Sequence, residues 1–179
     1  METSDEDLAQ AAIEGDAEAF AALLERHYDR IFRLAYRLTG REEQAEDITQ
    51  DICAGLPSKI AGFQARSKFT TWLYRVVVNA VEDTRRRQAT RSRAALGWGD
   101  VEQMRRAEAA EVAEAVEWLQ TAMRLLPLDL QETLALTLED EMTHAQAGEV
   151  LGVSEGTVSW RLAEIRKRLR AMRQEELAQ

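Results

Sequence analysis

Cysteine and histidine are nearly absent from this sequence. Cys53 is the single cysteine, which excludes a disulfide within the chain and suits a reducing compartment. The two histidines, His27 and His144, leave with it no plausible set of ligands for zinc. We therefore expect no bound metal, and we expect the protein to work in the cytoplasm.

Long apolar runs are also missing. A membrane-spanning helix needs a run of roughly 18 apolar residues, and no segment of the 179-residue chain approaches that length. The N-terminal residues METSDEDLAQ are acidic, whereas a signal peptide starts with basic residues followed by an apolar stretch. We expect a protein that is neither exported nor inserted into a membrane.

The motifs of common enzymes are absent as well. The sequence has no glycine-rich phosphate loop and no supported arrangement of Ser, His and Asp or of Cys and His. His27 lies on an apolar face of its segment, so a structural role suits it better than a catalytic one. We expect a protein that is not an enzyme and that uses no cofactor.

Proline is rare, and no alternating strand pattern is visible. The chain has two prolines and is rich in Ala, Leu, Glu and Arg, which favour helix. Ser4 and Asp16 can cap the first two helices, and Gly40 can end the second. We expect Pro57 to stop a third helix that begins at Glu42. The predicted fold class is all-α.

The fourth expected helix, FTTWLYRVVVNAVEDTRRR, has two different faces. At 100° per residue, Leu73 and Val77 fall on one side. The other side carries Arg75, Val78, Asn79, Glu82 and Arg86, with Trp72 beside Asn79. After this helix the periodicity lapses around the sequence GWG. We interpret residues 93–110 as a flexible linker between two small helical domains, at residues 1–92 and 111–179.

The formal net charge of −9 is unevenly distributed along the chain. Residues 1–58 carry 5 basic and 14 acidic side chains, and residues 59–95 carry 9 and 2. Residues 96–142 are again acidic, and residues 143–179 have a net charge of +1. Because electrostatic binding depends on where charges lie, acidic and basic segments are expected to meet different partners.

The C-terminal stretch EVLGVSEGTVSWRL has the pattern of a helix-turn-helix. Gly152 suits the tight turn, and Ser154 is a good N-cap for a helix that starts at Glu155. That helix repeats apolar residues at steps of four, three and four: Val158, Leu162, Ile165 and Leu169. Gly148 in the preceding helix costs roughly 1 kcal/mol of helix propensity relative to alanine. The pattern predicts a DNA-binding domain.

Four stretches in one order resemble the extracytoplasmic-function (ECF) group of bacterial RNA polymerase sigma factors. They are AEAFAALLERHYDRIFRLAYRLTG, EQAEDITQDI, FTTWLYRVVVNAVEDTRRR and LLPLDLQETLALTLEDEMTHAQAGEVLGVSEGTVSWRLAEIRKRLR. The resemblance implies an alternative sigma factor that binds core RNA polymerase, recognises promoter DNA and promotes its melting. It also implies a cognate anti-sigma factor as a partner. A free-standing helix-turn-helix regulator is the alternative.

The resemblance implies a role for each charged segment. The helix with EQAEDITQDI docks on basic clamp helices of the largest polymerase subunit in such factors, which implies core binding by Asp47, Gln50 and Asp51. The next loop and helix correspond to the part that opens the minus-ten element. The implied DNA-binding residues there are Arg66, Lys68, Trp72, Arg75, Asn79, Arg86 and Arg87. Core packing is the alternative for Trp72.

Two segments depart from the family pattern. The base-selecting loop of the family often has Gly-Glu-Ser after its Phe, whereas Phe63 is followed here by QARS. The recognition helix often carries more basic residues than this one. Its implied contacts to the minus-thirty-five element are Thr157, Ser159, Trp160, Arg161 and Lys167. Trp160 can instead contact a partner protein or cover the helix of Leu128. Trp98 can lie near the RNA exit path or between the domains.

Overall fold

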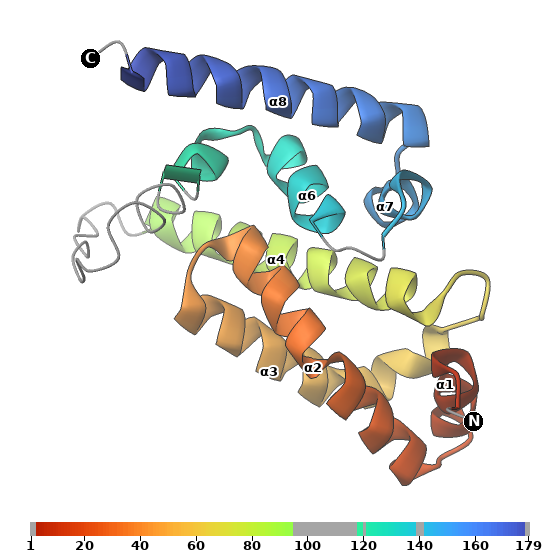
Figure 1. The fold of residues 1–179 in the computed structure, drawn as a ribbon. Coiled ribbons are helices and arrows are strands. Elements are labelled where there is room, and N and C mark those ends of the chain that lie inside the picture. The colour runs from red at the N-terminus through yellow and green to blue at the C-terminus, as the bar shows by residue number, and fades with distance from the viewer. Residues whose placement is uncertain (1–2, 95–117, 120, 139–141, 178–179) are drawn as a thin grey trace, which may run out of the picture.

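The computed structural model describes residues 3–94, 118–119, 121–138 and 142–177, and these residues form helices and short connections (Figure 1). The helices are α1 (Asp5–Ile13), α2 (Ala17–Thr39), α3 (Glu42–Lys59), η1 (Ile60–Gly62), α4 (Phe69–Ala94), α6 (Leu128–Thr137), α7 (His144–Leu151) and α8 (Glu155–Leu177). No strand occurs in the described part of the chain, which confirms the predicted all-α class. Trp98 and linker residues 95–110 lie outside the described residues.

The helix ends follow the predicted local signals. The Ser4 hydroxyl accepts a hydrogen bond from the Asp7 backbone N–H at 3.1 Å and caps α1. The Asp16 carboxylate accepts bonds from the first turn of α2. Gly40 ends α2 in the left-handed conformation at φ 67°, a region that favours glycine because it has no Cβ atom.

The prediction that Pro57 stops the third helix was wrong. Helix α3 continues to Lys59 with Pro57 inside its last turn. Proline removes one backbone donor, but the Ile60 backbone N–H still donates to the Leu56 carbonyl and completes the helix. The Ile60 side chain is buried, so packing also holds the extra turn against the core.

The first four helices form a bundle whose core is built from the expected faces. Helix α3 buries Ala45, Ile48, Ile52 and Leu56, as its spacing predicts. Helix α4 buries Phe69, Leu73 and Val77 against α2 and α3. Full burial of side chains of this size contributes about 1.5–3 kcal/mol each. The bundle therefore gives α3 and the start of α4 a firm base.

The predicted helix-turn-helix consists of α7 and α8. The Thr143 hydroxyl and the Gln146 side chain form a reciprocal capping box at the start of α7. Gly152 ends α7 at φ 68°, and the Ser154 hydroxyl accepts a bond from the Thr157 backbone N–H at 3.1 Å. Val158, Leu162 and Ile165 are buried, as predicted.

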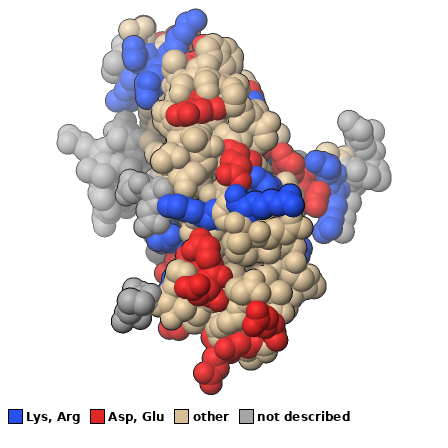
Figure 2. All heavy atoms as spheres, turned by 90° about the vertical axis from the view of Figure 1, so that its right-hand side faces the viewer, with Lys and Arg blue, Asp and Glu red and all other residues tan. Residues whose placement is uncertain are grey.

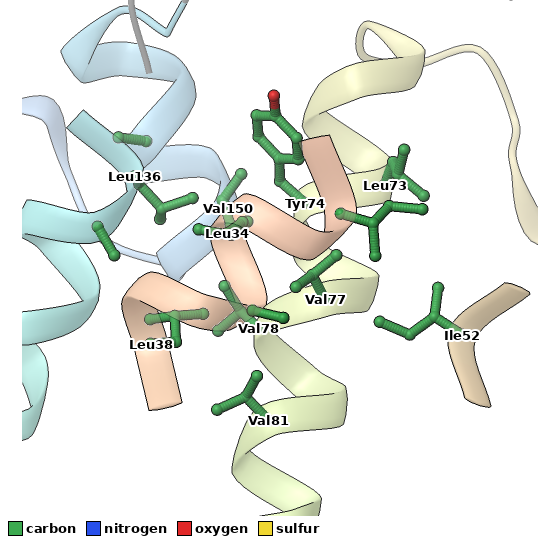
Figure 3. Close-up of a cluster of buried hydrophobic side chains, with 14 of the residues drawn as sticks. Leu34, Leu38, Ile52, Leu73, Tyr74, Val77, Val78, Val81, Leu136 and Val150 are labelled. Atoms are coloured by element: carbon green, nitrogen blue, oxygen red, sulfur yellow. The ribbon is translucent and has the colours of Figure 1, made fainter. Parts of the chain in front are cut away.

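The two halves of the chain pack against each other. Helices α6 and α7 lie between α8 and α4 (Figure 1), and α7 contacts α4 while α6 contacts α2. The expectation that Val78 faces outward was wrong, because Val78 and Tyr74 are buried. Figure 3 shows Leu136 and Val150 of the C-terminal half in the same cluster as these two side chains. Leu34, Tyr74, Val78, Leu136 and Val150 are called the apolar seam below.

Candidate nucleic-acid and protein interfaces

The predicted polymerase-binding residues share the exposed side of α3. Asp47, Gln50 and Asp51 are all exposed, whereas Ile48 and Ile52 on the other side are buried. Residues three and four apart share a face of an α-helix, so the polar set and the apolar set lie on different sides of α3. The structure thus brings the two carboxylates and the amide together on one accessible, acidic surface.

The predicted base-selecting loop spans residues 64–68 between two buried aromatic residues. The rings of Phe63 and Phe69 meet edge to face at a centroid distance of 5.5 Å. Trp72 joins them at 5.7 Å from Phe63 and is half-buried, so core packing accounts for part of its surface. Arg66 and Lys68 are exposed. The loop is therefore short, anchored at both ends and basic.

Ala65 gives this loop a strained backbone. Its φ is +52°, and it is the non-glycine residue with positive φ in the described part of the chain. A left-handed alanine costs roughly 1–2 kcal/mol because Cβ approaches the following carbonyl oxygen. Strained residues of this kind persist where the surrounding structure fixes the backbone.

The basic residues of α4 differ in what they contact. Asn79 and Arg87 are exposed. Arg86 is 75% exposed and pairs with Glu82 at 3.3 Å on its own helix. Arg75 reaches across to α7, where its Nη2 donates to the Glu149 carbonyl at 2.8 Å. In the packed state Arg75 is thus engaged by α7 although its side chain is 42% exposed, whereas Asn79 is exposed.

Arg85 is an inward-facing residue that the predicted set of DNA-binding residues does not include. Its guanidinium donates to the Leu38 carbonyl and lies 3.4 Å from Oε1 of Glu132 on α6. Burial lowers the pKa of Arg85, against the opposing effect of Glu132. Burial likewise raises the pKa of Glu132, against the effect of Arg85. The two charges therefore compensate each other at the junction of the two halves.

The recognition helix α8 presents most of its predicted DNA contacts to solvent. Ser159 and Lys167 are exposed, and Trp160 is 62% exposed, so it does not cover the helix of Leu128. Thr157 is half-buried, and its hydroxyl contacts the Ser154 hydroxyl at 2.9 Å.

Arg161 is the exception among these residues of α8. Its side chain is 15% exposed, and its Nε lies 3.4 Å from Oδ2 of Asp129. Nη1 of Arg161 also lies 3.3 Å from the Thr133 hydroxyl on α6. These contacts hold α8 against α6, so Arg161 reaches DNA only if the pair with Asp129 breaks.

Acidic and basic residues are unevenly distributed on the face shown in Figure 2. Asp and Glu gather at the lower end, where α1 lies, and Lys and Arg form a band above them, with further Asp and Glu beside and above this band. A polar hollow of about 570 Å³ opens beside this region, and Glu6, Lys68 and Thr70 line part of it. The predicted base-selecting loop therefore borders both acidic and basic surface.

Two family models match the chain in the order of its two halves. The model of sigma-70 region 2 matches residues 23–91, and the model of sigma-70 region 4 matches residues 116–169. Together they define a two-part transcription initiation protein of the sigma-70 class.

Similar proteins define the group more closely. The ECF sigma factor SigM of Mycobacterium tuberculosis H37Rv is 36% identical over 169 residues, covering 94% of this chain and 84% of SigM. The ECF sigma factor SigW of Bacillus subtilis is 28% identical over 167 residues, covering 87% of this chain and 89% of SigW. The chain belongs to the ECF RNA polymerase sigma factors. This finding confirms the predicted resemblance and favours it over a free-standing regulator.

Solved structures show the same fold. CnrH, solved in complex with the cytosolic domain of CnrY, has a TM-score of 0.72 at 23% identity and covers 97% of this chain and 99% of its own. RpoE of Bartonella quintana, solved with the anti-sigma factor NepR, has a TM-score of 0.74 at 20% identity. It covers 88% of this chain and 98% of its own.

Within the described residues, no helix combines the length and apolar character that a bilayer crossing requires.

Proposed function

We propose that the exposed side of α3 is the surface that binds core RNA polymerase. Asp47 and Asp51 lie there beside Gln50, opposite the buried Ile48 and Ile52. In the family the corresponding helix docks on basic clamp helices, and opposite charges across an interface speed association and fix its register. The separation of an acidic exposed side from an apolar buried one is the observation that carries this proposal.

The basic segment that follows is the proposed minus-ten interface. Opening a promoter requires that a base leave the stack and be held, which calls for hydrogen-bonding groups, aromatic surface and cations for the backbone. Arg66 and Lys68 in the loop and Asn79 on α4 are exposed and supply two of these chemistries. Trp72 offers the part of its surface that the aromatic cluster leaves open. Arg86 and Arg87 extend the basic surface along α4.

Helix α8 is the proposed reader of the minus-thirty-five element. Ser159, Trp160 and Lys167 project to solvent from a helix whose other side is buried on α6 and α7. Thr157 lies near the helix N-terminus, where backbone N–H groups favour phosphate. A helix of this kind enters the major groove with its N-terminal residues toward the bases.

The packed arrangement is proposed to open when both promoter elements are bound. The elements lie about 25 base pairs apart, which is on the order of 85 Å along B-DNA. A compact chain of this length has a radius of gyration of about 16 Å, so its diameter is about half that distance. Separation into a domain within residues 1–92 and a domain within 111–179 frees Arg75 from Glu149 and Arg85 from Glu132.

A cognate anti-sigma factor is a further proposed partner. The two structurally similar proteins were solved with protein partners, one of them named as an anti-sigma factor. The surfaces proposed here for polymerase and DNA are exposed and would be available to such a partner. Because all of these partners work beside the chromosome, the proposed location is the cytoplasm, and the proposed function involves no catalysis by the chain itself.

Reconstitution with core RNA polymerase tests the proposed function. The protein is mixed with core enzyme and run by gel filtration, and the resulting complex is tested for transcription from promoters selected out of a random DNA library. We expect co-elution and selective transcription. The proposal fails if the protein elutes apart from the core enzyme, or if the isolated chain binds promoters tightly and specifically at physiological salt.

A further inference from the structure

The residue that precedes helix α4 cannot cap it. The residue before Phe69 is Lys68, whose ammonium group has no acceptor and cannot bond the free backbone N–H groups of the first turn. The first four N–H groups of any helix have no partner within it. Water or an acceptor from elsewhere in the chain must therefore satisfy these groups.

Glu6 of α1 supplies that acceptor from 63 residues away. Its Oε1 accepts a hydrogen bond from the Phe69 backbone N–H at 3.0 Å. A carboxylate at a helix N-terminus also gains from the positive end of the helix dipole. Hydrogen bonds to an ionised acceptor are stronger than neutral ones. Glu6 is thus a cap for α4 that a distant helix provides.

The neighbouring residue holds α1 in the position that this cap requires. Oδ2 of Asp5 lies 2.8 Å from Nε2 of the buried His27, and Oδ1 lies 2.5 Å from Nη1 of Arg26. Asp5 therefore ties α1 to α2, while Glu6 ties it to α4. Helix α1 therefore connects α2 to the first residue of α4.

The cap lies next to the proposed base-selecting loop. Residues 64–68 join Phe63 to Phe69, whose rings are in contact, and Ala65 within them is held at φ +52°. A five-residue loop has little slack, so a shift of Phe69 changes the backbone of the whole loop. The strain at Ala65 is maintained only while both ends stay fixed.

We propose that Glu6 is a positioning residue for base selection in the minus-ten element. It acts by fixing the start of α4 and thereby the conformation of the loop at residues 64–68. This proposal rests on the proposed function of that loop. A fixed loop discriminates between bases because a wrong base then finds unpaired groups or a clash, whereas a loose loop adapts to it.

Glu6→Ala is the variant that tests the proposal, and Glu6→Gln and Glu25→Ala are its controls. The amide oxygen of Gln can still accept from Phe69, and Glu25 is an exposed acid on α2. Each variant is assembled with core RNA polymerase. Fluorescence anisotropy then measures binding to single-stranded minus-ten oligonucleotides that carry each of the four bases at each position.

Loss of base discrimination at unchanged core affinity is the expected result. Removing one hydrogen bond of this kind should lower the affinity ratio between the best and the worst base by about three- to tenfold in Glu6→Ala. Glu6→Gln should retain most of the ratio, and Glu25→Ala all of it. Circular dichroism should show the same helical content in all three variants.

Three outcomes would overturn the proposal in different ways. An unchanged ratio in Glu6→Ala shows that the cap is structural only, provided that Arg66→Ala alters base preference in the same assay. An unchanged ratio in both Glu6→Ala and Arg66→Ala shows that the loop does not select bases, which overturns the loop's proposed function as well. Equal loss in Glu25→Ala also contradicts a specific role for Glu6.

Discussion

Arg85 and Glu132 join the two halves of the chain through an ion pair with 3.4 Å between Nη1 and Oε1. The side chains are 26% and 10% exposed, and Arg85 also donates to the Leu38 carbonyl. An unpaired charge at such a place is costly, because neither bulk water nor a counterion fully replaces the lost partner. The pair therefore limits the cost of burying these two charges in the packed form, which the apolar seam stabilises.

Replacing Glu132 with Gln is expected to loosen the packed form. The change leaves Arg85 without its charged partner from α6. We expect the packing of the two halves to become less favourable by about 1–2 kcal/mol. This cost is smaller than for a fully buried pair because Arg85 is partly exposed. Energy transfer between dyes on α2 and α8 should report a larger mean distance. Glu155→Gln on exposed α8 surface is the control. Unchanged distances in Glu132→Gln would mean that the pair does not hold the halves together.

Reversing the charge of Asp47 and Asp51 together is expected to abolish binding to core RNA polymerase. Both carboxylates would become cations facing a basic partner, while the buried Ile48 and Ile52 side keeps the helix in place. Gel filtration with core enzyme measures the loss. The matched control reverses Glu42 and Glu43, which are exposed at the start of the same helix. Retained binding in the first double variant would refute the proposed interface.

Asn79→Ala and Lys167→Ala are expected to impair different steps. Loss of a base contact by Asn79 should cost about 1–3 kcal/mol in strand opening. Loss of Lys167 should weaken promoter binding and lower the salt slope by about one unit if it contacts phosphate. Permanganate footprinting on duplex and pre-melted templates separates the two. The roles are wrongly assigned if a pre-melted template rescues Lys167→Ala but not Asn79→Ala.

Gly148→Ala is expected to destabilise the C-terminal half, although alanine has the higher helix propensity. A Cβ atom at this position would lie 2.7 Å from the Val153 carbonyl oxygen, and backbone atoms cannot move aside cheaply. Overpacking of this kind costs about 1–3 kcal/mol. At Gly156, also in a helix, the nearest contact is an ordinary 3.8 Å to the Ser154 hydroxyl. Urea unfolding should show a lower free energy of unfolding for Gly148→Ala and a higher one for Gly156→Ala.

Stability is expected to fall as the pH drops below about 6.5 because of His27. Burial lowers its pKa, against the opposing effect of Asp5, and Arg30 and Arg26 lower it further. The unfolded chain then binds a proton at a pH where the folded chain does not, so the free energy of unfolding decreases as the pH falls through this window. Urea unfolding at several pH values measures this effect. Between neutral pH and lower pH, the free energy of unfolding should fall more steeply in the wild type than in His27→Gln. Parallel slopes would show that His27 does not titrate differently on folding.

Signals that act within one turn of helix could be predicted from the sequence. Ser4, Asp16 and Ser154 cap their helices through bonds to backbone groups two or three residues away, and the left-handed Gly40 and Gly152 follow the same local logic. These bonds depend on side-chain type and spacing alone. The separation of the α3 faces follows from helix period in the same way.

Contacts between distant segments could not be predicted in that manner. Val78 looked like part of an exposed face, but it is buried because the C-terminal half packs on α4. Glu6 was one acid among several in an acidic N-terminus, and its bond to Phe69 spans 63 residues. Helical periodicity describes one helix at a time, so it carries no information about which other helix covers a given side.

The apolar seam affects the apparent affinity of the protein for promoters. Tyr74, Val78 and Leu34 lose their cover from Leu136 and Val150 whenever the halves separate as proposed. Exposure of such surface to water is unfavourable, so we expect open molecules to be a minority of the free protein. The apparent dissociation constant for polymerase on a promoter then equals the intrinsic one divided by the fraction of open molecules, so the measured affinity is lower. Changes in the seam therefore alter the occupancy of promoters without touching polymerase or DNA.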